Sequence, residues 1–202
     1  AILGGHVVKH ALERSGLDPQ EIEDVVIGCG FPEGATGHNV ARQCALKAGL
    51  PVTSAGTTVN RFCSSGLQAI SIAAQRVVMD KVPAIVAGGL ESVSLIQPNM
   101  NTNNYTEAGL LESKPEIWMP MIETADTVGH RYEVSREAQD EYALQSQHRT
   151  AAAQKDGRLN AEIVPLETMM LVKDKETGVI SEKSVKLEKD EGNRPETNIE
   201  GL

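Results

Sequence analysis

The chain has 202 residues, of which 40% are hydrophobic and 23% charged, a size and composition typical of a globular protein that can bury a core. Its 19 Lys and Arg against 28 Asp and Glu give a net charge of −9, which argues against nucleic-acid binding and against docking on an anionic membrane surface. No apolar run approaches the roughly 20 residues of a membrane-spanning helix, and the three irregularly spaced cysteines indicate neither a disulfide framework nor a zinc site.

The first part of the chain predicts alternating helices and strands. Residues 3–15 place apolar side chains on one helical face, and Gly16 follows as an end signal. Residues 24–28 form a continuous apolar run, typical of a strand covered on both faces. Asn39 is positioned to cap a second helix, which we expect to run to about Ala48.

Three further elements continue this alternation. Residues 57–60 are β-branched and strand-like, and residues 84–87 form another buried strand. Residues 64–80 have helical apolar spacing and carry no charge before Arg76, so we expect a helix buried on almost all sides. The order predicts an α/β fold with a mainly parallel sheet and helices on its faces.

The second part of the chain is more polar, with charged residues about twice as dense after residue 134. Residues 99–105 are Asn-rich and predict a loop, whereas residues 122–132 predict a helix. Ser135 is a candidate N-cap for a long helix that ends near Asp156. Residues 162–191 contain short apolar pieces between charged turns, so we expect exposed strands or hairpins there.

Cys63 is the candidate reactive residue, because it lies between a predicted strand and a predicted helix. Either Ser64 or Ser65 can cap that helix, and the N–H groups and positive end of a helix favour a thiolate and can hold an oxyanion. A small buried hydrophobic residue is the alternative interpretation of Cys63. The local pattern favours neither interpretation over the other.

The segment from Val59 to Val77 closely resembles the active-site signature of thiolases, the 3-ketoacyl-CoA and acetyl-CoA acyltransferases. Residues 88–94 resemble the Gly-Gly-x-Glu strand end of that family, and residues 135–147 resemble a helix of its substrate-covering loop domain. The Asn-Arg-x-Cys-Ser-Ser-Gly form is more similar to the 3-ketoacyl-CoA degrading branch than to biosynthetic acetoacetyl-CoA thiolases. The signature residues that match are Asn60, Cys63, Ser64, Ser65, Gly66, Leu67, Ala69, Ile70 and Val77.

The resemblance implies that Cys63 is the nucleophile of a two-step acyl transfer. Its thiolate attacks the 3-keto carbon of a 3-ketoacyl-CoA, acetyl-CoA leaves, and the acyl thioester on Cys63 is transferred to a second CoA. The reverse reaction is a Claisen condensation. Met121 matches a loop-domain Met beside the acyl chain, although an ordinary core Met is an equal alternative. The resemblance implies no metal and no redox cofactor, with coenzyme A as a substrate.

The resemblance also implies a layered α/β fold, with residues 1–94 as the N-terminal core and residues 95–202 as a truncated loop domain. We expect both ends to be cut, with the first strand and the C-terminal half absent. That half carries the family's Gly-His-Pro histidine, its second catalytic cysteine and its Asn-Glu-Ala-Phe asparagine. None of the five histidines here precedes a proline, so we expect the 202 residues alone to be catalytically incomplete.

Three alternatives stay open at this point. His38 could act as a base for Cys63, although a surface histidine is the favoured interpretation. The chain could be a non-catalytic thiolase-like subunit that binds acyl-CoA or a partner protein. A ketosynthase of the same fold ranks lower, because Asn-Arg-Phe precedes Cys63.

The resemblance further implies a homodimer or homotetramer that acts on CoA and 3-ketoacyl-CoA in fatty acid β-oxidation. We expect no nucleic-acid or membrane partner. Reduced cysteines favour the cytoplasm, and the mitochondrial or peroxisomal matrix is the alternative because no targeting signal is visible.

Overall fold

The computed structural model describes residues 1–202, which divide into two compact units, Ala1–Thr102 and Asn103–Leu202. The predicted division into an N-terminal core (residues 1–94) and a loop domain (residues 95–202) refers to the domains of the thiolase family. These two compact units do not test it, so it stays a prediction. No helix in the chain is both long and apolar enough to cross a membrane.

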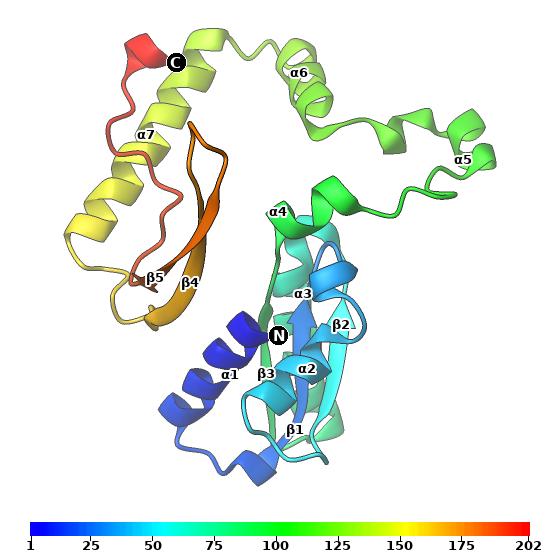
Figure 1. Ribbon diagram of the computed structural model, residues 1–202. Coiled ribbons are helices and arrows are strands. Elements are labelled where there is room, and N and C mark those ends of the chain that lie inside the picture. Colours follow the sequence, from blue (N-terminus) through cyan, green and yellow to red (C-terminus); the bar gives the residue numbers. More distant parts are fainter. The chain divides into compact units, whose positions relative to one another are not determined.

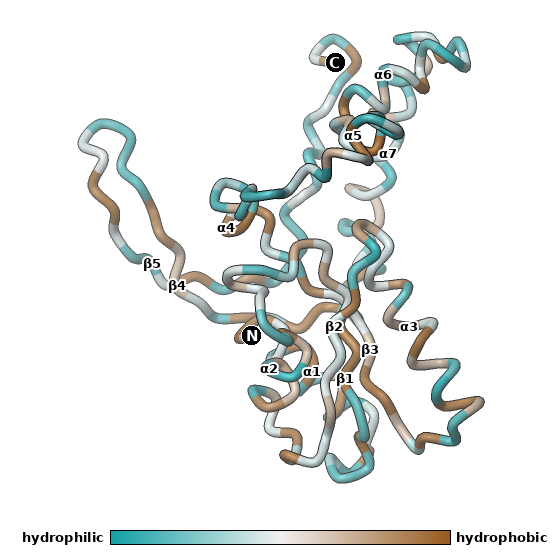
Figure 2. Tube along the Cα trace, turned by 90° about the vertical axis from the view of Figure 1, so that its right-hand side faces the viewer, coloured by the Kyte–Doolittle hydropathy of each residue, from teal (hydrophilic) through white to brown (hydrophobic).

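The first unit is a three-layered α/β structure around a parallel sheet. The strands have the order β2-β1-β3, and β1 pairs in parallel with both neighbours. Two helices cover one face of the sheet and α3 covers the other (Figures 1 and 2), which confirms the predicted parallel α/β arrangement. The elements are α1 (Ile2–Ser15), β1 (Ile22–Gly28), α2 (Val40–Lys47), β2 (Ala55–Val59), α3 (Ser65–Gln75), β3 (Ala84–Gly89) and the short α4 (Val93–Ile96).

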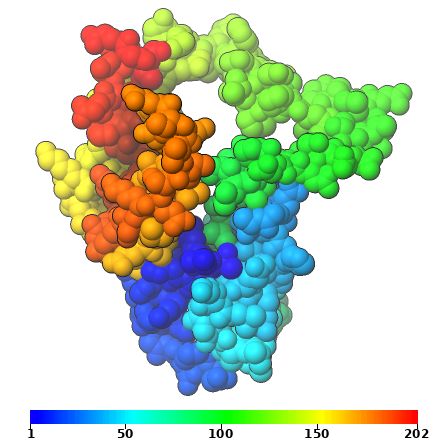
Figure 3. Space-filling model, viewed as in Figure 1, coloured from blue at the N-terminus to red at the C-terminus, as the bar shows by residue number.

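The hydrophobic core lies between β1 and the helices α1 and α2. β1 contributes Val25 and Ile27, α1 contributes Val8, and α2 contributes Val40 and Cys44, all of them buried. Burial of such apolar side chains is the main favourable term in folding. In the space-filling view, α1 and α2, in blue and cyan, hide most of the sheet (Figure 3).

The start of α2 follows the prediction closely. The Asn39 side chain accepts a hydrogen bond from the Arg42 N–H at 3.3 Å and donates one to the Gly56 carbonyl at 2.5 Å. One residue therefore caps the helix and ties it to β2, so the loop before α2 is fixed to the sheet.

The prediction that residues 64–80 are buried on almost all sides is wrong. α3 continues as a π-helix, Arg76–Asp80, and only Ser65, Ala69 and Ala73 of α3 are buried. Leu67 is 71% exposed, and other apolar side chains of the same segment share that open face, which Figure 2 shows as hydrophobic stretches along α3. The physical reason is that α3 contacts the sheet along one side, and no other element of this unit covers its opposite side.

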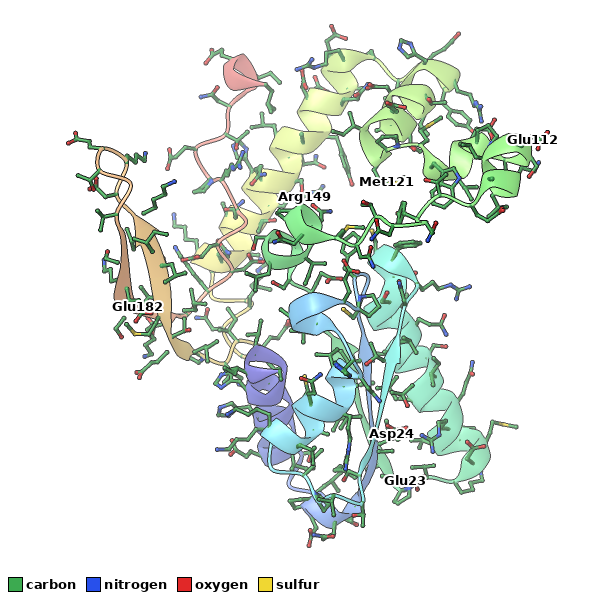
Figure 4. The ribbon with its side chains drawn as sticks, turned by 45° about the vertical axis from the view of Figure 1, so that its right-hand side comes forward. Glu23, Asp24, Glu112, Met121, Arg149 and Glu182 are labelled. Atoms are coloured by element: carbon green, nitrogen blue, oxygen red, sulfur yellow. The ribbon has the colours of Figure 1, made fainter.

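A buried carboxylate anchors the π-helix to the sheet. Asp24 of β1 is almost fully buried, and its Oδ2 accepts a hydrogen bond from Arg76 Nη1 at 2.6 Å. Arg76 Nη2 also pairs with Glu23 Oε1 at 3.0 Å. Figure 4 labels both carboxylates, which lie together near the amino end of β1. A buried charge needs such a partner, because its desolvation is otherwise uncompensated.

The second unit contains helices and one hairpin, and none of its residues is buried. The Ser135 hydroxyl accepts a hydrogen bond from the Ala138 N–H at 3.2 Å, so the predicted N-cap is confirmed. The antiparallel hairpin of β4 and β5 confirms the exposed strands expected there. The short helix α5 had no clear sequence signal. The elements are α5 (Ala108–Ser113), α6 (Met121–Arg131), α7 (Arg136–Lys155), β4 (Leu166–Lys173) and β5 (Ile180–Leu187).

Candidate active site

Cys63 lies in the short helical turn Phe62–Ser64, which joins the carboxyl end of β2 to the start of α3. It is exposed, whereas Cys29 and Cys44 are buried. Burial raises the pKa of the Cys29 and Cys44 thiols, which keeps them protonated and unreactive. The interpretation of Cys63 as a buried hydrophobic residue is therefore wrong, and its nucleophilic role stays a prediction.

The two serines after Cys63 do not cap α3 with their side chains, so that expectation is wrong. The Ser64 hydroxyl donates to the Arg61 carbonyl at 3.1 Å, and the Ser65 hydroxyl donates to the Phe62 carbonyl at 2.6 Å. Both hydroxyls turn back to carbonyl groups of the preceding turn, a bonding mode that competes with capping in Ser and Thr. The N–H groups at the start of α3 are thus not bound by either hydroxyl, and their use as an oxyanion site stays a prediction.

Gly28, the last residue of β1, lets α3 approach the sheet closely. A Cβ atom at position 28 would lie 2.2 Å from the Ser65 carbonyl carbon and 2.4 Å from the Gly66 nitrogen. Only glycine allows this contact, which packs the first turn of α3 directly on the strand. The turn with Cys63 is thereby held between two fixed ends, β2 on one side and the anchored start of α3 on the other.

Glu91 joins the loops that follow β1 and β3, a function that the sequence analysis did not assign. Its Oε2 accepts hydrogen bonds from the Gly30 N–H at 2.7 Å and the Phe31 N–H at 3.2 Å. The Cys29 thiol donates to its Oε1 at 3.7 Å. The only sequence signal was the position of Glu91 in the Gly-Gly-x-Glu motif, since contacts between residues 60 positions apart leave no local pattern.

A crevice of about 250 Å³ opens between the loop after β1 and the segment formed by α4 and the residues that follow it. Glu33, Gly34 and Ala35 line it from the loop after β1. The opposite side is lined by Leu95, Ile96, Asn99 and Asn101. The Glu33 carboxylate accepts a hydrogen bond from the Asn101 N–H at 3.1 Å. Cys63 follows the carboxyl end of β2, so the crevice and the thiol share the edge of the sheet at which α/β proteins bind ligands.

Met121 and His38 are both exposed. Met121 is the first residue of α6 in the second unit and is 72% exposed (Figure 4), so the alternative of a core Met is wrong, while its place beside an acyl chain stays a prediction. His38 is exposed, in agreement with a surface histidine. No group of three His, Cys, Asp or Glu side chains in the chain is placed to hold a metal ion.

Comparisons with known proteins point to one family. The family model described as "Thiolase, N-terminal domain" matches residues 1–202. The chain is 40% identical over 200 residues to a 3-ketoacyl-CoA thiolase of Bacillus subtilis, covering 99% of this chain and 51% of the relative. It is 39% identical over 177 residues to an acetyl-CoA acetyltransferase of Chromobacterium violaceum, covering 81% and 44%.

A β-ketoadipyl-CoA thiolase of Escherichia coli is 38% identical over 201 residues, covering 92% of this chain and 48% of the relative. The chain spans about half the length of the curated relatives it matches. Because the family model covers every residue and the similarity runs along almost the whole chain, the chain belongs to the thiolase family and matches its N-terminal domain.

Proposed function

We propose that the protein carrying this chain is a thiolase, an acyltransferase that cleaves 3-ketoacyl-CoA with CoA to acetyl-CoA and a shortened acyl-CoA, or runs the reverse condensation. The observation that carries the proposal is the exposed Cys63 at the junction of β2 and α3, in a chain whose other two cysteines are buried. The names of its relatives, which include 3-ketoacyl-CoA thiolase and acetyl-CoA acetyltransferase, support the same reaction class.

The reaction proceeds in two covalent steps. The Cys63 thiolate attacks the 3-keto carbon, the bond between the α and β carbons breaks, and the released acetyl-CoA carbanion takes up a proton. The acyl group stays on Cys63 as a thioester. A second CoA thiol then loses its proton and attacks this thioester, which releases the shortened acyl-CoA and restores the thiolate. Splitting the transfer into two steps lowers each barrier.

Both steps need groups that move protons. In the family to which this chain belongs, the resemblance assigns that chemistry to a histidine followed by proline and to a second cysteine. None of the five histidines of this chain is followed by proline. Cys29 and Cys44 are buried, and burial raises the pKa of both thiols. Residues 1–202 alone are therefore catalytically incomplete in this proposal.

The remaining parts of the proposal concern substrates and assembly. CoA enters as a substrate, with no metal and no redox cofactor, and Met121 lies beside the acyl chain. The protein acts as a homodimer or homotetramer in the degradative direction, in fatty acid β-oxidation. Its compartment is the cytoplasm, with the mitochondrial or peroxisomal matrix as alternatives.

Acyl trapping on the full-length protein tests this proposal. We expect brief incubation with acetoacetyl-CoA to leave an acetyl group on the peptide that contains Cys63, detected by mass spectrometry. Cys63→Ala abolishes the adduct and lowers thiolysis by a factor on the order of 10³ or more. Cys44→Ala is the matched control, because Cys44 lies on α2 on the other face of the sheet, and this variant keeps both adduct and turnover.

An adduct on another residue, or thiolysis that survives Cys63→Ala, contradicts the proposal. A full-length protein that binds acyl-CoA but never forms the adduct favours the alternative of a non-catalytic thiolase-like subunit. Full turnover by the 202-residue chain alone contradicts its catalytic incompleteness.

A further inference from the structure

The residue directly before Cys63 has an unusual backbone conformation. Phe62 has a φ of 46°, in the left-handed region that glycine and asparagine tolerate and that a bulky aromatic residue rarely adopts. Its side chain is exposed, so packing of the ring does not stabilise this conformation. A strained residue of this kind persists only where the surrounding structure holds it.

Two side chains hold the peptide groups of Phe62. The Asn60 Oδ1 accepts a hydrogen bond from the Phe62 N–H at 2.8 Å. The Ser65 hydroxyl donates to the Phe62 carbonyl at 2.6 Å and accepts from the Arg61 N–H at 2.8 Å. The Ser64 hydroxyl also donates to the Arg61 carbonyl at 3.1 Å, and the Ser65 N–H donates to the Phe62 carbonyl. The polar groups on both sides of the strained residue are thus bound, and the Ser65 hydroxyl both donates and accepts within this turn.

Ser65 is the anchored member of this pair. It is 4% exposed, whereas Asn60 is exposed. Its own backbone packs against Gly28, because a Cβ at that glycine would overlap the Ser65 carbonyl group. The Ser65 hydroxyl therefore joins the Cys63 turn to a part of the molecule that is fixed to the central strand.

We propose that Ser65 is a positioning residue for the Cys63 nucleophile. Its hydroxyl holds Phe62 in the left-handed conformation, and this fixes the direction in which the next residue, Cys63, presents its thiol. The inference rests on the proposed nucleophilic function of Cys63 and adds the residue that orients it. A small displacement of a reacting group is enough to lower a rate by a factor of about 100.

Steady-state kinetics of the full-length protein with acetoacetyl-CoA and CoA test this inference. Ser65→Ala removes both hydrogen bonds of the hydroxyl, and we expect kcat to fall by about 10- to 100-fold with little change in KM. Ser71→Ala is the matched control, because it removes a serine further along α3 and leaves kcat unchanged. Thermal unfolding followed by circular dichroism verifies that each variant is folded.

A second substitution separates positioning from a general loss of structure. Asn tolerates the left-handed region better than Phe, so Phe62→Asn reduces the need for the Ser65 hydroxyl. We expect Ser65→Ala to lower kcat much less in the Phe62→Asn background than in the native background. A kcat that Ser65→Ala leaves unchanged, or a loss of the same size in both backgrounds, overturns the inference.

The labelling rate of Cys63 by iodoacetamide keeps this result separate from the proposed function. If the native protein forms no acyl adduct, the proposed function fails, but the labelling rate still reports the position of the thiol. Ser65→Ala is then expected to change that rate several-fold relative to Ser71→Ala. Equal labelling rates for the two variants overturn the positioning by Ser65.

Discussion

The two units of the chain are stabilised in different ways. Every buried residue belongs to the first unit, where β1 lies at the centre of the sheet and α2 and β1 each contribute four buried apolar residues to the core. The second unit has no buried residue, and local hydrogen bonds define its elements, such as the Ser135 cap of α7 and the Glu107 cap of α5. The first unit therefore depends on a buried core. The second depends on caps, turns and exposed hydrogen bonds, such as those that Asn193 and Arg194 donate to Gln147 of α7.

This difference bears on where a reactive group can be placed with accuracy. Cys63 follows a strand of the packed sheet and precedes a helix whose first turn touches β1. Met121 begins a helix in a unit without a core. A rigid support of packed elements suits a nucleophile, and weakly packed segments open locally at low free-energy cost.

The largest expected difference between the two units is in the free energy of unfolding when an isoleucine side chain is truncated in each of them. Ile27 in β1 is 3% exposed and Ile180 in β5 is 63% exposed. We expect Ile27→Ala to lower the free energy of unfolding of the first unit by about 2–5 kcal/mol, because it leaves a cavity in the core. Ile180→Ala changes stability by less than about 0.5 kcal/mol.

Urea denaturation, with amide hydrogen exchange of β1 and β5 as local probes, measures both effects. Similar losses for the two isoleucines contradict the comparison, because they require that β5 is packed as closely as β1.

The ion pair of Arg76 and Asp24 gives the next effect in size. Arg76→Ala leaves the Asp24 carboxylate almost buried and without its cation, since Arg76 Nη1 donates to Asp24 Oδ2 at 2.6 Å. Arg76 itself is partly solvated, so we expect a loss of about 2 kcal/mol, below the value for a fully buried pair. In thermal unfolding, the double variant Arg76→Ala with Asp24→Asn recovers part of this loss, because the buried charge is removed as well. If the double variant instead loses as much stability as the two single variants together, the two residues do not act as a pair.

The sequence predicted those elements whose signals are local. The apolar run of β1, the Asn39 cap of α2 and the Ser135 cap of α7 all depend on residues within a few positions, and the structure has each of them. The burial of α3 was not predictable in the same way. A lack of charged residues shows that a helix can be buried on any side, but it does not show which sides other elements cover. Which side is covered depends on elements far away in the sequence.

In the candidate site, too, the features with local sequence signals were predicted and the others were not. The position of Cys63 between a strand and a helix followed from local patterns and from the family signature, and the structure has that junction. The orientation of the two serine hydroxyls did not follow, because a serine at a helix start can bond either N–H or carbonyl groups. The left-handed conformation of Phe62 was not predicted either. The one relevant feature of the sequence is Asn60, because an Asn side chain can accept a hydrogen bond from the backbone N–H two residues later.

A smaller effect is expected at the cap of α7 in the second unit. Ser135→Ala removes the acceptor for the Ala138 N–H, and we expect a loss of about 1 kcal/mol. Thr150→Ala is the matched control within α7, because the Thr150 hydroxyl bonds only the Ser146 carbonyl and Ala is the better helix former. Amide exchange at the first turn of α7 measures the difference, and equal exchange in the two variants contradicts a helix defined by its cap.

The smallest effect concerns pH and the turn between β4 and β5. The Asp174 carboxylate accepts hydrogen bonds from the Thr177 N–H at 2.7 Å, the Thr177 hydroxyl at 2.8 Å and the Glu176 N–H at 3.0 Å. These bonds, led by the Thr177 N–H, lower the pKa of Asp174 below its usual value. A carboxyl group whose pKa is lower in the folded state stabilises that state above its unfolded pKa of about 3.9.

That contribution is lost as the pH falls through the lowered pKa, so acid opens the turn and alkali does not. We expect the Thr177 amide resonance to shift, and its exchange to accelerate, only below about pH 4. Asp174→Asn keeps an acceptor at this position but removes the titration, so its Thr177 resonance is flat over the same range. Because the second unit has no buried core, a change in this one turn should stay within the hairpin, whereas a shift that spreads to α7 requires packing that its exposed residues do not show.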